Sequence, residues 1–360
     1  MKKFVILSLS IFISASVFAQ GKTKNIIVVT LDGYRWQELF RGPDSVKLFK
    51  RSFFGQDSVW KIKKHWNGKT AAERREKLMP FFWNTIAKQG QIYGNRDLGN
   101  YVNVTNPFKV SHAGYSEMFI GYADPKRSNG SPNNPHENIF EFFNKQSGYK
   151  DKVAVITSWD EYYRILNSER NKFPIYSGWV DIGGKLNETQ KLLNKQQHYM
   201  PKIFGTTERL DVATYPMAKE YIKQNHPKVF YLAFIDTDAF AHRGQYDFYL
   251  DAAHNTDDMI ADLWAQIQGD PFYKDKTTLF ITTDHGRGEE ADWTDHGRKV
   301  PEADQIWFAV MGPDTQPLGE IKESGQLYQK QFAKTIAALL GFDFVSPNPI
   351  GDVIQSVLKK

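Results

Sequence analysis

The chain has 360 residues, of which 41% are hydrophobic and 24% are charged, so it can bury a large core and is not a disordered chain. Its formal net charge of +5 is too small to indicate a nucleic-acid-binding protein. The absence of cysteine excludes disulfides, thiolate metal sites and cysteine nucleophiles, so any bound metal must take oxygen and nitrogen ligands.

The N-terminal residues have the pattern of a secretory signal peptide. Two lysines precede an apolar run that begins at Phe4, and small residues lead to Ala19. A transmembrane anchor is the alternative, but the run is short and interrupted by serines. We therefore expect residues 1–19 to be a cleaved signal peptide, and the protein to be periplasmic or secreted with no stable membrane anchor.

Five short apolar runs follow along the chain, and each has the composition of a strand that is buried on both faces. They are residues 25–31, 152–157, 228–235, 277–283 and 306–311. Apolar residues recur at helical spacing over 259–267 and over 332–340, the latter before an expected C-cap at Gly341. This alternation predicts an α/β fold with a three-layer αβα arrangement and a mostly parallel central sheet.

Residues 20–360 are expected to form a single domain, from which two segments depart. Residues 41–70 are basic and aromatic, and residues 160–215 combine Tyr, Asn, Lys and Gln with weak periodicity. We interpret both as loops or a cap inserted outside the sheet. Such insertions often lie beside the site at the carboxyl ends of the strands. The alternative is that they are surface elaborations with no part in the site.

Three of the predicted strands run into residues that can bind a metal ion. These residues are Asp32 after the first strand, Asp238 and His242 after the third, and Asp284, His285 and His296 after the fourth. Each one alone can be a turn former, a helix cap or a surface residue. Together they make an oxygen and nitrogen donor set at the edge where parallel strands place their sites. That set suits a pair of divalent cations, with zinc first because imidazole is abundant.

A hydroxyl group stands before a predicted short helix. Ser111 precedes the sequence HAGYSEMFIG, so its oxygen would lie at a helix N-terminus, where backbone N–H groups favour an anion. Ser111 is therefore the candidate nucleophile, with a simple N-cap as the structural alternative. Thr105 is the other hydroxyl within reach.

Taken in order, these residues resemble the alkaline phosphatase superfamily, most closely its nucleotide pyrophosphatase/phosphodiesterase branch and the related phosphate-irrepressible alkaline phosphatases. The shared pattern is LDG after the first strand, a hydroxyl ten residues before Gly121, a D-x-x-x-H pair, and DHG after a buried strand. Two features depart from it. The hydroxyl is a serine where that branch usually has threonine, and the last histidine follows the first DHG by only eleven residues.

The resemblance implies two divalent metal ions, with zinc expected. One ion would be held by Asp238, His242 and His296, and the other by Asp32, Asp284, His285 and the oxygen of Ser111. It also implies an asparagine that contacts a phosphoryl oxygen, for which Asn133 and Asn134 are both candidates. His112 and Arg298 are further candidates for contact with the substrate.

The function that the resemblance implies is that of an exported phosphoric ester hydrolase, a phosphomonoesterase or a phosphodiesterase/nucleotide pyrophosphatase, which acts through a phosphoserine intermediate. Its expected partner is a small-molecule phosphate ester, with no nucleic-acid partner other than nucleotides as substrates. The oligomeric state is not predicted.

Three alternatives stay open. A sulfatase-like enzyme would need a C/S-x-P-x-R signature, and SHAGY lacks both the proline and the arginine. A phosphomutase-like enzyme would act on a cytosolic substrate, which the predicted export argues against. A non-catalytic phosphate-binding or glycan-binding protein would not need an activated hydroxyl beside six metal ligands.

Overall fold

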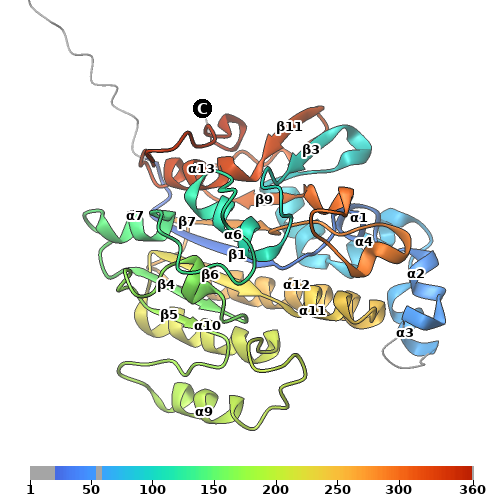
Figure 1. Cartoon of the computed structure of the whole chain (residues 1–360), viewed down its shortest axis with the longest axis horizontal. Helices are drawn as coiled ribbons and strands as arrows, with labels where there is room; N and C mark the ends of the chain where they lie inside the picture. The colour runs from blue at the N-terminus through green and yellow to red at the C-terminus, as the bar shows by residue number, and fades with distance from the viewer. Residues whose placement is uncertain (1–20, 54–58, 359–360) are drawn as a thin grey trace, which may run out of the picture.

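The computed structural model describes residues 21–53 and 59–358, so the predicted signal peptide lies outside the described residues. Its centre is a mixed sheet of eight strands in the order β10-β2-β9-β7-β1-β6-β4-β5 (Figure 1). The strands are β1 Asn25–Leu31, β2 Gln91–Tyr93, β4 Val153–Thr157, β5 Ile175–Ser177, β6 Val229–Phe234, β7 Thr277–Thr282, β9 Phe308–Met311 and β10 Gly319–Glu320.

Most neighbouring strands of this sheet are parallel. Only β9 runs against its neighbours, β2 and β7, and all other pairs in the sheet are parallel. A second sheet has three short strands in the order β11-β3-β8. They are β3 Asn100–Asn103, β8 Gln305–Ile306 and β11 Gly325–Tyr328. The predicted mostly parallel sheet is confirmed.

Helices cover both faces of the large sheet (Figure 1). On one face lie α6 Ser111–Ile120, α7 Ile139–Lys145 and α13 Phe332–Leu339, and on the other lie α10 Asp211–Asn225 and α12 Tyr246–Gly269. Side chains of β1 alternate between two cores: Val28 packs with the first group of helices and Val29 with the second. This alternation is the reason that a strand buried on both faces is apolar at most positions. The predicted three-layer arrangement is therefore confirmed.

The remaining helices are short. They are α1 Trp36–Arg41, α2 Ser45–Phe49, α3 Val59–His65, α4 Ala71–Leu78, α5 Ala87–Gln89, α8 Tyr162–Ile165, α9 Glu188–Gln197 and α11 Asp236–His242, with the π-helix η2 Phe82–Ile86. The 3-10 helices are η1 Arg51–Phe53, η3 Arg96–Leu98, η4 Glu290–Thr294, η5 Pro301–Asp304, η6 Gln329–Gln331 and η7 Gln355–Val357. Among the described residues, no helix has the length and apolar character needed to cross a membrane.

Two elements differ from their predicted form. The expected strand 306–311 is divided at Trp307, whose indole N–H donates to the carbonyl oxygen of Tyr34 at 2.8 Å. Ile306 therefore pairs in the small sheet and Phe308 in the large one. The helix that was expected to have its C-cap at Gly341 has it at Leu340, and Gly341 follows in the left-handed region with φ +81.

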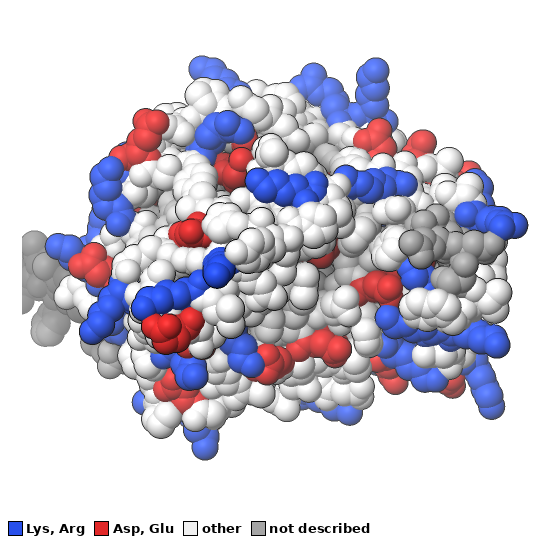
Figure 2. Space-filling view, turned by 90° about the horizontal axis from the view of Figure 1, so that it is seen from below, with Lys and Arg blue, Asp and Glu red and all other residues white. Residues whose placement is uncertain are grey.

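The two atypical segments have different structures. The described part of residues 41–70 forms helices α2, η1 and α3 and contributes no strand. Residues 160–215 contain α8, α9 and the start of α10, but also β5, which adds an edge strand to the large sheet beside β4. On the face seen in Figure 2, basic and acidic side chains are interspersed, in keeping with the small net charge.

Candidate metal centre

Three adjacent central strands bring the predicted site residues to one edge of the sheet. β1 lies between β7 and β6, with Thr30 level with Thr282 and Leu31 level with Phe234. The chain leaves β1 into Asp32, leaves β6 into α11, and leaves β7 into Asp284. Because the strands are parallel and in register, their carboxyl ends present these side chains at the same level.

The first group of donor atoms surrounds the hydroxyl of Ser111. Its Oγ lies 3.3 Å from Oδ1 of Asp32 and 3.1 Å from Nε2 of His285. The same Nε2 lies 3.4 Å from Oδ1 of Asp32 and 3.4 Å from Oδ2 of Asp284. All four residues are buried, so this group is shielded from bulk water.

The second group lies beside the first and opens to solvent. Nε2 of His242 is 3.2 Å from Oδ2 of Asp238 and 3.0 Å from Nε2 of His296. Asp238 connects the groups, because its Oδ1 is 3.9 Å from Nε2 of His285. The His242 side chain is 43% exposed, so small molecules can reach this end of the centre. Asp238 thus lies between the groups, whereas the sequence placed it in one of them.

The two Asp-His-Gly motifs meet through their imidazoles, which stack with ring centroids 3.9 Å apart. Nδ1 of His285 lies 2.8 Å from the carbonyl oxygen of Gly286, and Nδ1 of His296 lies 3.1 Å from that of Lys109. A carbonyl oxygen only accepts, so Nδ1 carries the proton in both rings. Each Nε2 lone pair is therefore directed into the centre, as a metal ligand requires.

Burial and crowding shift the pKa of the acidic groups. Burial, followed by the charges of the other aspartates, raises the pKa of Asp32 well above its ordinary value. Burial and Asp238 likewise raise the pKa of Asp284 to about 8. Burial would also raise the pKa of Asp238, but Arg287 and His242 hold it well below its ordinary value. Three carboxylates and the one guanidinium of Arg287 leave an excess of negative charge, 3 − 1 = 2, when all are ionised.

The donor set fits divalent cations. Ligands held at ~2.0–2.1 Å around a tetrahedral ion lie about 3.3 Å from one another, and most of the separations given above are between 3.0 and 3.4 Å. Oδ2 of Asp284 is buried without a hydrogen-bond partner, which is costly unless a cation meets it. Arg287 can only donate to Nδ1 of His242, at 3.3 Å, so Nε2 of neutral His242 carries the proton and donates to Nε2 of His296 at 3.0 Å. A cation bound between the two rings would replace this proton.

Two glycines near the centre stand where a larger side chain would collide with neighbouring residues. Gly33 of LDG has φ +56, and a Cβ there would lie 2.8 Å from atoms of both Arg287 and Asp238. Gly114, one turn into α6, lets the helix approach the backbone after β7, because a Cβ would lie 2.4 Å from the carbonyl oxygen of Asp284. The contact brings Ser111 to the centre.

Ser111 is the first residue of α6, whereas the sequence placed it just before the helix. It is not an N-cap, since Val110 occupies that position and offers no side-chain cap. The cap comes from a distant residue: Oδ1 of Asn129 accepts the backbone N–H of His112 at 3.0 Å. Asn129 is exposed, and its side chain stands beside Ser111 at the helix N-terminus. Asn129 has no functional signal in the sequence, because an Asn-Gly pair in a loop indicates only a turn.

The two predicted asparagines lie elsewhere in this loop. Asn134 is buried, and its Oδ1 accepts the backbone N–H of His136 at 3.0 Å, so the side chain supports the loop itself. Asn133 is partly buried beside it. Nδ2 of Asn134 lies 3.5 Å from Oγ of Ser116, in the middle of α6, whereas Asn129 contacts the N-terminus of that helix.

The remaining candidates for substrate contact or for the nucleophile interact with other side chains of the protein. His112 is buried, with Nδ1 2.7 Å from Oε1 of Glu161, and burial lowers its pKa to about 4. The guanidinium of Arg298 lies over the ring of Phe108, 4.9 Å from its centroid. Thr105, the alternative nucleophile, donates its hydroxyl to Glu117 at 2.7 Å and takes part in a buried network there.

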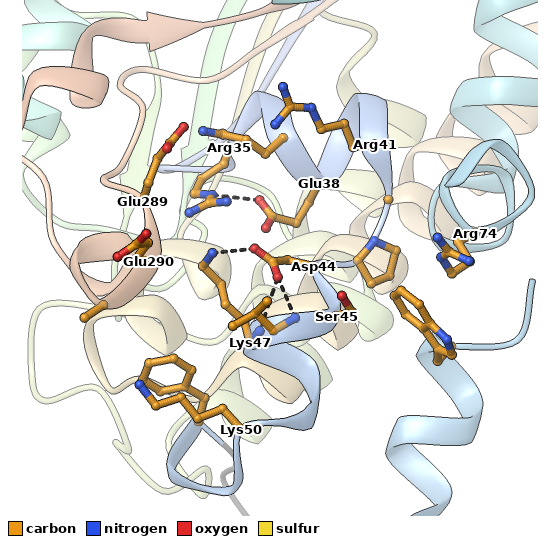
Figure 3. Close-up of a pocket in the computed structure, with 17 residues that line it drawn as sticks. Arg35, Glu38, Arg41, Asp44, Ser45, Lys47, Lys50, Arg74, Glu289 and Glu290 are labelled. Carbon is orange, nitrogen blue, oxygen red and sulfur yellow. Dashed lines mark hydrogen bonds and ion pairs between the residues drawn. The ribbon is translucent and has the colours of Figure 1, made fainter. Parts of the chain in front are cut away.

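A cavity of about 590 Å³ lies behind the loop that links the two Asp-His-Gly motifs. Figure 3 shows Arg35 and Lys47 each turned toward a carboxylate within it, Glu38 and Asp44 respectively. Arg35 also donates to the carbonyl oxygen of Gly288 at 2.7 Å, so it supports this loop from the cavity side. None of the predicted metal ligands lines the cavity.

One family model matches part of the chain. Residues 181–343 match the model of the Metalloenzyme superfamily, a span that includes all of the predicted ligands except Asp32 and Ser111. None of the curated proteins matches the chain.

Three solved structures illustrate the fold. Wild-type alkaline phosphatase PafA matches with a TM-score of 0.60 and 10% identity over 95% of this chain and 99% of that chain. A phosphonate monoester hydrolase, SpPMH from Silicibacter pomeroyi, matches with a TM-score of 0.55 and 12% identity over 93% of this chain and 76% of that chain. A protein in the alkaline phosphatase superfamily from Vibrio parahaemolyticus matches with a TM-score of 0.54 and 15% identity over 90% of this chain and 68% of that chain. The chain thus has the fold of the alkaline phosphatase superfamily, which confirms the resemblance, and it carries candidate metal-binding Asp/His clusters like a metalloenzyme.

Proposed function

We propose that the protein is a metal-dependent phosphoric ester hydrolase with Ser111 as its nucleophile. One observation carries the proposal: a serine hydroxyl at a helix N-terminus lies within 3.3 Å of two buried donor atoms, on Asp32 and His285. An isolated cap would not need such neighbours. Two divalent ions, with zinc first, would be held by the sets Asp238, His242, His296 and Asp32, Asp284, His285, Ser111.

When bound, these ions would lower the pKa of the hydroxyl and stabilise the charge on the phosphoryl oxygens. The chain supplies the rest. Ser111 Oγ attacks phosphorus, the bond to the departing alkoxide breaks, and a phosphoserine forms; water then hydrolyses it and restores the hydroxyl. The N–H groups in the first turn of α6 orient the phosphoryl group, with the amide of Asn129 beside them.

Several observations support an ester hydrolase over the alternatives. The residues after Ser111 lack the proline and arginine of a sulfatase signature. The exposure of His242 leaves the centre open to small molecules such as phosphate esters, including nucleotides. The N-terminal sequence supports export to the periplasm or the medium.

Metal analysis with parallel ester assays tests the proposal. We expect about two zinc ions per chain, and faster hydrolysis of p-nitrophenyl phosphate or bis-p-nitrophenyl phosphate than of p-nitrophenyl sulfate. The ratio of the two phosphate rates assigns the enzyme to monoesters or diesters. A protein that binds no divalent metal, or one that prefers the sulfate ester, would overturn the proposal.

A further inference from the structure

Two residues of α6, one helical turn apart, contact the two oxygens of the same carboxylate. Ser111 Oγ lies 3.3 Å from Oδ1 of Asp32, and the hydroxyl of Tyr115 donates to Oδ2 of Asp32 at 2.9 Å. Residues at i and i+4 share a helix face, so one face of α6 meets Asp32 with both side chains. Tyr115 has no exposed surface, and its hydroxyl has no access to bulk water.

The ring of Tyr115 is held in place by other aromatic side chains. It packs against Tyr162 with ring centroids 4.9 Å apart, and against Phe119 at 6.2 Å. Behind them, the hydroxyl of Tyr162 lies 2.8 Å from that of Tyr231, which lies 2.7 Å from Oγ1 of Thr30. Thr30 is on β1, two residues before Asp32. The strand that carries Asp32 and the helix that carries Ser111 are therefore joined through this network.

The phenol acts as a donor toward Asp32, because a carboxylate oxygen only accepts. With Oδ2 engaged by that hydroxyl, the carboxylate is held with Oδ1 toward Ser111 and His285. Without it, the carboxylate would be free to turn and to offer either oxygen, or both, to a cation.

We infer that Tyr115 is a positioning residue that holds Asp32 as a one-oxygen ligand, so that Oδ1 of Asp32 and Oγ of Ser111 meet the same ion. The inference rests on the proposed function, because it assigns Tyr115 to the metal group that contains the nucleophile. It also gives a reason for the tyrosine in SHAGY that is independent of core packing, since a phenylalanine would fill the same space.

The test compares two variants that each lose one buried hydroxyl. Tyr115→Phe removes the donor to Asp32, whereas Tyr273→Phe, the matched control, removes a buried hydroxyl that donates to the carbonyl oxygen of Pro227, near the end of β6 that is farther from the centre. Each metal-free protein is titrated with zinc against a chelator of known affinity, and its thermal unfolding is recorded. We expect Tyr115→Phe to weaken one of the two zinc sites about 10- to 100-fold, and Tyr273→Phe to change zinc affinity less than about threefold while lowering stability comparably.

A double-mutant cycle with Asp32→Asn separates positioning from general packing. If Tyr115 acts through Asp32, adding Tyr115→Phe to Asp32→Asn should weaken zinc binding no further. Equal zinc affinities of wild type and Tyr115→Phe, or additive losses in the cycle, would overturn the inference. A wild-type protein that binds no zinc would instead refute the proposed function, so the two failures are distinguishable.

Discussion

The hydroxyl oxygen of Ser111 lies 3.1 Å from Nε2 of His285, although the two residues are 174 positions apart in the chain. Ser111 comes from the start of α6 and His285 from the turn after β7. Their contact depends on the close approach of α6 to that turn, which Gly114 permits. Ser111 and the candidate metal ligands are thus held together by the packing of a helix on a sheet.

Replacing Ser111 by alanine should remove turnover and retain most of the metal. The other donors of its group stay in place, so zinc content should remain close to that of wild type, while kcat for p-nitrophenyl phosphate should fall by more than about a thousandfold. Thr105→Ala is the control, because its hydroxyl bonds to Glu117 and does not face the centre. Full activity in Ser111→Ala would show that another group is the nucleophile.

Replacing Asn129 by alanine should impair catalysis without loss of metal. The variant loses the cap on the N–H of His112 and the amide beside the phosphoryl position, so kcat/KM should fall about 10- to 100-fold, which corresponds to the loss of one or two hydrogen bonds to a charged group. Asn133→Ala, in the same loop, should stay within about threefold of wild type. The opposite ranking in steady-state assays would return the role to Asn133.

A methyl group added at Gly114 should separate α6 from the turn after β7. Its Cβ would lie 2.4 Å from the carbonyl oxygen of Asp284, so Gly114→Ala should lower the free energy of unfolding by about 1–3 kcal/mol and reduce activity. Gly269→Ala is the matched control, since no atom lies within 4 Å of a Cβ there, and it should be neutral or stabilise by up to about 1 kcal/mol. Urea unfolding measures both, and equal effects would contradict the close packing.

The buried carboxyl of Asp257 should make stability depend on pH away from the metal centre. Burial raises its pKa from 3.8 to about 7, against the opposing hydrogen bonds from the backbone N–H groups of Phe81 and Phe82. The folded state therefore binds this proton more tightly than the unfolded chain does. The resulting stabilisation is complete below about pH 4 and is lost as the pH rises through about 7.

Asp257→Asn removes this titration. Unfolding in urea from pH 4 to pH 8 should show wild type losing stability relative to Asp257→Asn as the pH rises. Absolute stabilities will differ because asparagine has one acceptor for two N–H groups, so the slope is the decisive quantity. Parallel curves for the two proteins would mean that Asp257 titrates alike in the folded and unfolded chains.

The central strands and the residues that follow them were predictable, and for one physical reason. A strand buried on both faces is mostly apolar and uncharged, so an aspartate such as Asp32 or Asp284 marks where it ends. Short strands such as β2 and β11 have no such signal, because pairing with distant segments forms them. The division of 306–311 coincides with the tertiary contact between Trp307 and Tyr34, which no local pattern encodes.

The residues of the candidate site also differ in whether the sequence alone could identify them. Residues that end strands could be identified from the sequence, whereas Asn129 and Tyr115 could not. Asn129 reaches the α6 N-terminus only because its loop folds back over the helix. Tyr115 has the pattern of a core aromatic, and its hydroxyl bond to Asp32 is evident only when the helix is placed on the sheet.

The order of the strands also has a consequence for protein synthesis. β1 is made first, yet both of its neighbours, β6 and β7, come from the second half of the chain. A nascent chain that stops before β6 carries an apolar strand with neither of its two edges paired, the kind of surface from which aggregation begins. The candidate metal centre is complete only after His296 has left the ribosome, so the nascent chain lacks the full set of candidate ligands during most of its translation.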